Sequence, residues 1–137
     1  MLHTINIQNI LFLDIETVPE VELFSDLSEE KQQLYAQKTQ YQRKEEFTAE
    51  EFYHRAGIWA EFGKIICISV GYFVQQKEER QFRVTSFAGH DEVKILQGFS
   101  NLLSTHFNLN KHLLCAHNGK EFDFPYIARR MIIHRID

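Results

Sequence analysis

The sequence predicts an α/β fold in which a mixed sheet and flanking helices follow the order βββαβα. Three observations carry this prediction: strand-like runs at 11–17, 64–74 and 81–88, an amphipathic helix pattern at 91–107, and a short apolar run at 113–116 followed by a second helix pattern. The 137 residues suffice for one hydrophobic core but not for two ordinary domains. We therefore expect a single domain over residues 1–137.

Composition narrows the class of protein without deciding its partner. The chain is 44% hydrophobic and 25% charged, as soluble globular proteins are. Its net charge of -4 provides no global positive field for nucleic acid, but a site that binds its substrate through metal ions does not need one. The first ten residues lack a basic flank and a long apolar core, so we expect no export signal, no membrane span and a cytoplasmic location. Cys67 and Cys115 lie in apolar runs without metal-ligand spacing, which predicts buried thiols.

The first strand carries two carboxylates at its end. Side chains two apart in a strand share a face, so Asp14 and Glu16 should point the same way while Leu13 and Ile15 enter the opposite layer. Two like charges this close disfavour each other unless a cation or a proton neutralises them. The alternative is a strand that simply ends in solvated acids.

Residues at about 20–62 predict a helical insertion outside the sheet. Val18 and Pro19 should stop the first strand, and a polar stretch follows. Ser28 can cap a helix that runs to about Lys44, and the segment 48–51 has the form of a capping box. The apolar positions of this stretch neither alternate nor form a helical stripe, so no strand is expected there.

The next segments predict the rest of the sheet and its first helix. The run at 64–74 is rich in β-branched residues and favours a central strand, and the charged turn at 77–80 returns the chain as a hairpin. Asp91 can cap a helix with one apolar stripe, the pattern of a helix packed on a sheet. The apolar run at 113–116 predicts a fourth, buried strand.

A second helix should begin near Phe122, with Pro125 in its first turn. We expect these side chains to point inward: Ile127, Met131 and Ile132 or Ile133. Because no strand follows that helix in the sequence, one of its faces should be poorly covered.

A third acid lies at the junction between the fourth strand and this helix. Functional groups of open α/β sheets gather at such junctions, and Asp123 occupies this one. Taken alone, Asp123 could be only the N-cap of the helix. Together with Asp14 and Glu16, it completes a set of oxygen ligands suited to a pair of divalent cations.

Two stretches resemble motifs of a known family. Residues 11–19, LFLDIETVP, resemble the first motif of the DEDD superfamily of 3'-5' exonucleases, and residues 117–125, HNGKEFDFP, resemble the second. The closest branch is similar to the proofreading domain of family B DNA polymerases. The resemblance implies a ribonuclease H-like fold and two-metal phosphodiester hydrolysis with Mg²⁺ or Mn²⁺ at the 3' end of single-stranded or frayed DNA.

The resemblance also implies roles for individual residues. Asp14 would bridge the two metals, Glu16 would hold the metal that carries the attacking water, and Asp123 would hold the metal at the leaving group. Substrate contacts would come from four further residues: Ile15 and Thr17 at the 3' terminal nucleotide, and Asn118 and Phe122 along the single strand.

The chain departs from the family at the third motif, a Tyr or His four residues before a last Asp on a further helix. His134 and Asp137 are three residues apart and follow the second motif directly, so we do not assign them this role. The resemblance therefore covers an amino-terminal portion only, and we expect this stretch to be inactive or very weak alone. The alternative function is a noncatalytic nucleic-acid-binding or interaction module with the same fold.

Basic and imidazole side chains add no further site. The seven histidines show no metal-ligand spacing, and His117 alone lies near the acids. Lys120, Arg129 and Arg130 could touch phosphates, but the sequence favours a solvated helix face for them.

Overall fold

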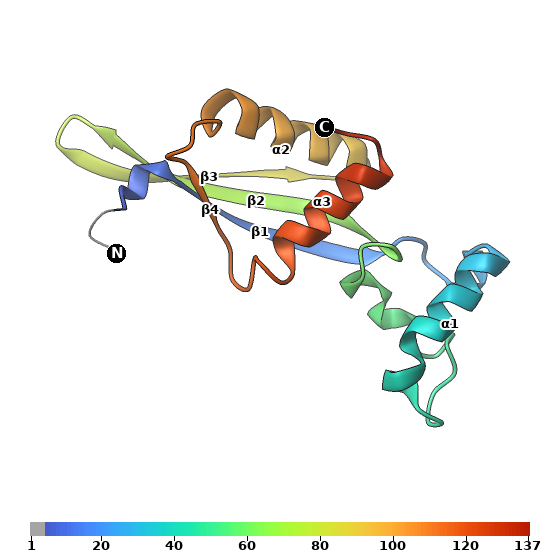
Figure 1. Cartoon of the computed structure of the whole chain (residues 1–137). Coiled ribbons are helices and arrows are strands. Elements are labelled where there is room, and N and C mark those ends of the chain that lie inside the picture. The colour runs from blue at the N-terminus through green and yellow to red at the C-terminus, as the bar shows by residue number, and fades with distance from the viewer. Residues whose placement is uncertain (1–4) are drawn as a thin grey trace. The chain divides into compact units, whose positions relative to one another are not determined.

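A computed structural model describes residues 5–137. The strands are β1 (Ile10–Pro19), β2 (Gly63–Gln76), β3 (Glu79–Ala88) and β4 (Leu113–Cys115), and the α-helices are α1 (Glu29–Arg43), α2 (Glu92–His106) and α3 (Asp123–Ile133) (Figure 1). Short 3-10 helices are η2 (Ile7–Asn9), η3 (Phe24–Asp26) and η4 (Tyr53–Ile58). The chain divides into two compact units, residues 1–16 with 65–137 and residues 17–64.

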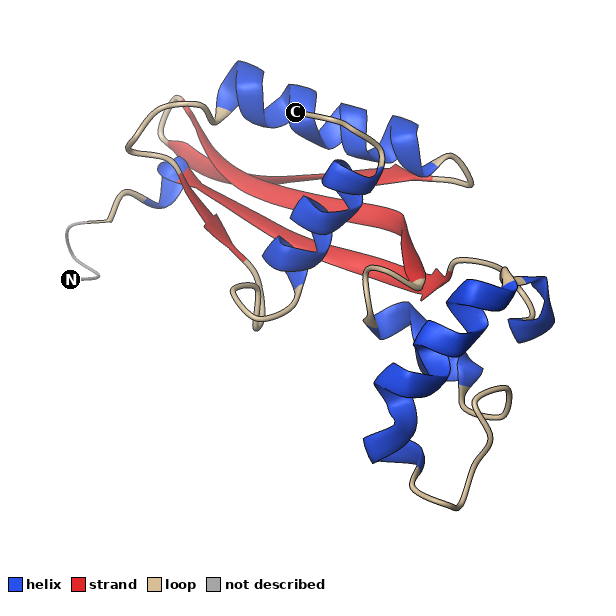
Figure 2. Cartoon of the chain, turned by 45° about the vertical axis from the view of Figure 1, so that its right-hand side comes forward, coloured by secondary structure: helices blue, strands red, loops and turns tan. Residues whose placement is uncertain are grey.

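The sheet has four strands in the order β3-β2-β1-β4. β2 and β3 form an antiparallel hairpin over ten residue pairs, from Cys67 with Ala88 to Gln76 with Glu79. β4 pairs parallel to β1 over three residues only, and the pairing ends at Phe12 and Cys115. The mixed α/β architecture expected from the sequence is therefore present, and Figure 2 shows its strands and helices by colour.

One face of β1 is buried and the other is open. Leu11, Leu13 and Ile15 are at most 6% exposed, whereas Asp14 and Glu16, which alternate with them, are exposed. This period of two follows from the pleat of a strand that has a hydrophobic layer on one side only. The predicted faces of the two acids are therefore confirmed.

Helix α2 covers the sheet as its apolar stripe predicts. Asp91 caps the helix by accepting a hydrogen bond from the Lys94 backbone N–H at 3.3 Å. Leu96 and Phe99 are at most 2% exposed, and Gly98 lies so close to Phe87 of β3 that an added Cβ would be 2.7 Å from its ring. Close approach of helix and sheet thus depends on a residue without a side chain.

Two expectations about burial were wrong. β4 is exposed along its whole length, and the thiol residue Cys115 is exposed with it, because β4 is a short edge strand whose one strand partner among residues 5–137 is β1. In α3, Ile127 is buried, but Ile132 and Ile133 are 74% and 50% exposed. An edge strand and a helix end have neighbours on fewer sides than the interior positions that an apolar run suggests.

The 17–64 unit has its own core and no strand beyond the ends of β1 and β2. Ser28 caps α1 through a 3.2 Å bond from the Lys31 backbone N–H, as expected. The capping box forms with both reciprocal bonds, between Thr48 and Glu51, but leads into turns and η4 rather than an α-helix. Tyr35 is fully buried within a cluster of aromatic rings, and its ring centroid lies 5.1 Å from that of Phe62.

None of the helices formed by residues 5–137 is both long enough and apolar enough to cross a membrane.

Candidate functional site

The candidate site forms where the edge of β1 becomes free. Because β4 stops pairing at Phe12, the backbone of β1 beyond that residue has no strand partner on this side among residues 5–137. The Asp123 carboxylate lies near the Ile15 backbone N–H of this part of β1, and this N–H acts to lower the pKa of Asp123. The end of one strand and the start of a helix thus bring the second predicted motif onto the first.

Asp123 is held in an environment that disfavours its charge. Its side chain is only 3% exposed, and burial together with the nearby Asp14 carboxylate raises the pKa of Asp123. Its own backbone N–H, the backbone N–H of Ile15 and the nearby His117 act to lower this pKa. A buried acid beside a second acid is an arrangement that a cation would stabilise.

The structure also decides against the simplest alternative for Asp123. The residue at the N-cap position of α3 is Phe122, whose apolar side chain cannot accept a capping hydrogen bond. Asp123 is the first residue of the helix, and its carboxylate is directed to the strand. Asp123 therefore connects α3 with β1 and does not serve only as a helix cap.

The turn before α3 explains the other residues of the second motif. Asn118 has a φ of 53°, a conformation that asparagine tolerates better than most residues. Gly119 is buried, and an added Cβ would lie 2.8 Å from both the Ala116 Cβ and the Phe124 ring. Phe124 is half-buried against this turn, which agrees with a packing role.

The four residues proposed to contact the substrate differ in their exposure and in the partners that they already have within the protein. Asn118 is exposed, and the half-buried Phe122 ring packs on Tyr126 with centroids 5.4 Å apart. The Thr17 hydroxyl donates to the Gly57 carbonyl at 2.7 Å, and the Ile15 N–H lies near the Asp123 carboxylate. Ile15 and Thr17 thus have structural partners that the sequence did not predict.

The three acids differ in their effect on one another. Asp14 acts on the pKa of Asp123, whereas Glu16 is not among the causes of that shift. Within residues 5–137, no three His, Cys, Asp or Glu side chains are grouped so that they could hold a metal ion. The structure therefore brings together the pair Asp14 and Asp123, and joining Glu16 to them stays a prediction.

The sequence missed a charged cluster that joins α3 to the start of α2. Arg130, expected on a solvated face, is only 4% exposed and donates to Glu92 from Nε at 3.0 Å and from Nη2 at 2.6 Å. His134 Nε2 lies 2.6 Å from the same carboxylate, a contact that gives this histidine a structural partner. The signal was weak, because Glu92 directly follows a capping Asp and resembles an ordinary first-turn acid.

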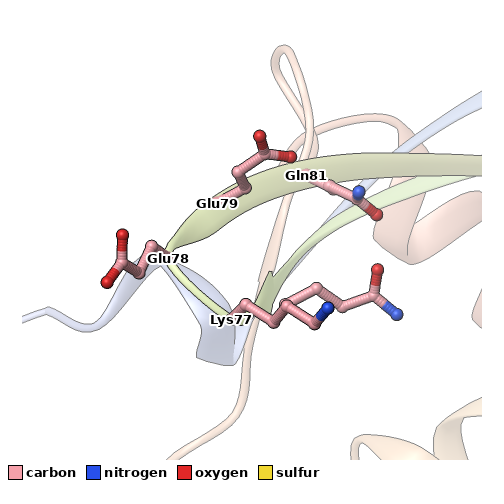
Figure 3. Close-up of a pocket in the computed structure, with 5 residues that line it drawn as sticks. Lys77, Glu78, Glu79 and Gln81 are labelled. Atoms are coloured by element: carbon pink, nitrogen blue, oxygen red, sulfur yellow. The ribbon is translucent and has the colours of Figure 1, made fainter.

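A concave surface at the β2–β3 hairpin does not resemble a site. It is lined by exposed side chains of the turn and of the adjoining strand ends, namely Gln76, Lys77, Glu78, Glu79 and Gln81. Figure 3 shows Glu78 and Lys77 extending in different directions, so their charged groups do not converge on one point.

Comparison with models of known protein families and with curated proteins finds no match to this chain.

Proposed function

We propose that this chain belongs to a metal-dependent 3'-5' exonuclease with a ribonuclease H-like fold, which removes nucleotides from the 3' end of single-stranded or frayed DNA. One observation supports the proposal most: the buried Asp123 carboxylate lies near the Ile15 N–H of β1 and near enough to Asp14 for the Asp14 charge to raise its pKa. Two residues far apart in the sequence thus meet, and both belong to the stretches that resemble the family's motifs.

The residues fit a hard divalent cation. Asp14 and Asp123 offer carboxylate oxygens, which Mg²⁺ and Mn²⁺ prefer, and their mutual repulsion would be relieved by a shared positive charge. Asp14 and Asp123 would hold the ion, and Glu16, exposed on the same face of β1 as Asp14, would complete the set. A bound cation would stabilise negative charge at the scissile phosphodiester and lower the pKa of a water molecule.

The protein's own groups would orient the substrate. Asn118 is exposed at the turn before α3 and can donate to a phosphate or a base, and the half-buried Phe122 ring offers an edge to a sugar or base. Residues 1–137 contain no match to the third motif, which in the family supplies a water-orienting Tyr or His and a further Asp. We therefore expect the 137-residue stretch alone to hydrolyse DNA very slowly, since a catalytic acid or base commonly contributes about 10²- to 10⁴-fold.

The test is degradation of a 5'-labelled single strand with Mn²⁺, by the 137-residue chain and by two variants. We expect slow shortening from the 3' end that Asp14→Asn abolishes and that Asp137→Asn, an exposed acid outside the proposed site, leaves unchanged. A strand with a blocked 3' end should be resistant.

Three results would contradict the proposal. They are shortening that Asp14→Asn does not reduce, equal cleavage of the blocked strand, and DNA binding that needs no metal and that Asp14→Asn leaves unchanged. The last would favour the noncatalytic binding module.

A further inference from the structure

Helix α3 contacts neighbouring elements through polar groups at two points along its length. At its start, the buried Asp123 carboxylate lies near the Ile15 backbone N–H of β1. Two turns later, Arg130 donates three bonds of 2.6 to 3.0 Å to the Glu92 carboxylate at the start of α2. At about 3.6 residues per turn, side chains seven residues apart lie on nearly the same face of a helix.

Glu92 is itself fixed in place. Its Oε2 accepts a hydrogen bond from the Ile65 backbone N–H of β2 at 2.6 Å, and its Oε1 contacts His134 Nε2 at 2.6 Å. Glu92 and Arg130 are 7% and 4% exposed, so water does not compete for these bonds. The carboxylate is thus a junction of α2, β2 and α3.

Such a junction restricts motions that apolar packing alone permits. Between the two polar contact points, α3 rests on the buried Ile127, and apolar contact of this kind has no preferred direction that would set the rotation of the helix. A guanidinium that donates from two nitrogens to one carboxylate fixes direction as well as distance. Rotation or sliding of α3 would therefore break the bonds of Arg130 and move Asp123 away from Ile15.

We propose that Glu92 is a positioning residue, which through Arg130 holds α3 in the orientation that keeps the Asp123 carboxylate buried against β1, near the Ile15 N–H. This inference deepens the proposed function, because it assumes that Asp123 serves the cation site. Glu92 and Arg130 touch neither the substrate nor the cation. Their effect on the site passes through the helix.

The main test compares Arg130→Lys with Arg129→Lys. Lysine keeps the charge at position 130 but loses the planar fork, and Arg129 is the exposed neighbour on the same helix. We expect Arg130→Lys to raise the hydrogen-exchange rate of the Ile15 amide about tenfold or more and to weaken Mn²⁺ binding by a similar factor, as changes behind a metal ligand do. Amides of the β2–β3 pairing should stay protected, and Arg129→Lys should change neither quantity.

A double variant separates positioning from general stability. Glu92→Gln combined with Arg130→Met removes the charged pair, yet leaves no unpaired buried charge, and the side-chain amide oxygen introduced at position 92 can still accept from Ile65. If the double variant remains folded and its Ile15 amide exchanges as fast as in Arg130→Lys, the positioning role stands. An Ile15 amide that stays protected in either folded variant would overturn it.

The exchange measurement needs neither metal nor DNA, so the two proposals can fail separately. Loss of Ile15 protection in a protein that binds no Mn²⁺ would keep the positioning role and reject the exonuclease function.

Discussion

Asp123 combines two features that a purely structural residue seldom shares: it is buried and its charge is disfavoured. Burial and the charge of Asp14 raise its pKa, while its hydrogen bonds act against that rise. Sites of this kind are functional candidates because protein stability alone would favour an uncharged residue there.

The effect of Asp14 on the pKa of Asp123 gives the first prediction for a single residue. Asp14→Asn should lower the pKa of Asp123, because it removes the like charge and leaves the burial unchanged. Glu16→Gln is the matched control and should change this pKa far less, since Glu16 is not among its causes. Carboxyl-carbon NMR titration of Asp123 measures both. Equal shifts in the two variants, or none with Asp14→Asn, would show that Asp14 and Asp123 are not the close pair.

Glu92 gives a second prediction, on acid stability. Burial alone would raise its pKa, but the hydrogen bonds from Arg130, Ile65 and His134 outweigh burial and hold the pKa below the ordinary value of 4.5. A group with a depressed pKa in the folded state contributes stability above the unfolded-state value, and this contribution is lost as the pH falls through the folded-state value. The protein should therefore lose stability steadily below about pH 4.5.

Glu92→Gln should flatten that loss in urea unfolding between about pH 5 and 2. It should also lower the free energy of unfolding at about pH 7 by about 3–5 kcal/mol, because Arg130 loses its charged partner inside the protein. Glu121→Gln, at an exposed acid near the site, is the control and should follow the parent protein. A Glu92→Gln curve parallel to that of the parent would refute the assignment.

At the scale of elements, the turn before α3 depends on a position without a side chain. Gly119→Ala should lower the free energy of unfolding by about 1–3 kcal/mol, because the added Cβ would crowd Ala116 and the Phe124 ring at 2.8 Å. Lys120→Ala, at the exposed next residue, should be nearly neutral. Chemical denaturation of both variants measures their free energies of unfolding. Equal values would mean that the turn accommodates the added Cβ without cost.

The core of the 17–64 unit gives a prediction that does not involve the site. The buried Tyr35 hydroxyl donates to the Phe52 carbonyl at 2.7 Å, and burial raises the pKa of Tyr35 to about 12. Tyr35→Phe should cost about 1–3 kcal/mol, because the buried carbonyl loses its donor. Tyr41 is 90% exposed, so Tyr41→Phe should have no effect on thermal unfolding. A neutral Tyr35→Phe would show that water reaches this carbonyl.

At the scale of the whole molecule, sequence pattern predicted the element order and most of the boundaries. Alternation in β1, the stripe of α2 and the caps at Ser28 and Asp91 are local signals, and each has its expected counterpart in the structure. β1 nevertheless continues to Pro19, past the residues that should have stopped it. Proline is tolerated at the end of a strand, where its missing N–H removes no ladder bond.

What the sequence could not predict depends on contacts between distant segments. The exposure of β4 follows from its place at the edge of the sheet, and the burial of Arg130 follows from a partner 38 residues earlier. Likewise, the motifs placed Asp14 and Asp123 in one site, but only the structure shows that Asp123 reaches β1 where β4 ends. The chain forms two compact units, and the single-domain expectation stays a prediction.

The account depends most on one claim, that Asp14 and Asp123 together form a site for a divalent cation. Titration with Mn²⁺, followed by paramagnetic broadening of backbone amide signals, tests it directly. We predict that the amides of Asp14, Ile15 and Asp123 broaden first, and that Asp14→Asn removes this effect without unfolding the protein. Broadening that begins at the charged hairpin turn around Glu78, or that Asp14→Asn leaves unchanged, would contradict the claim.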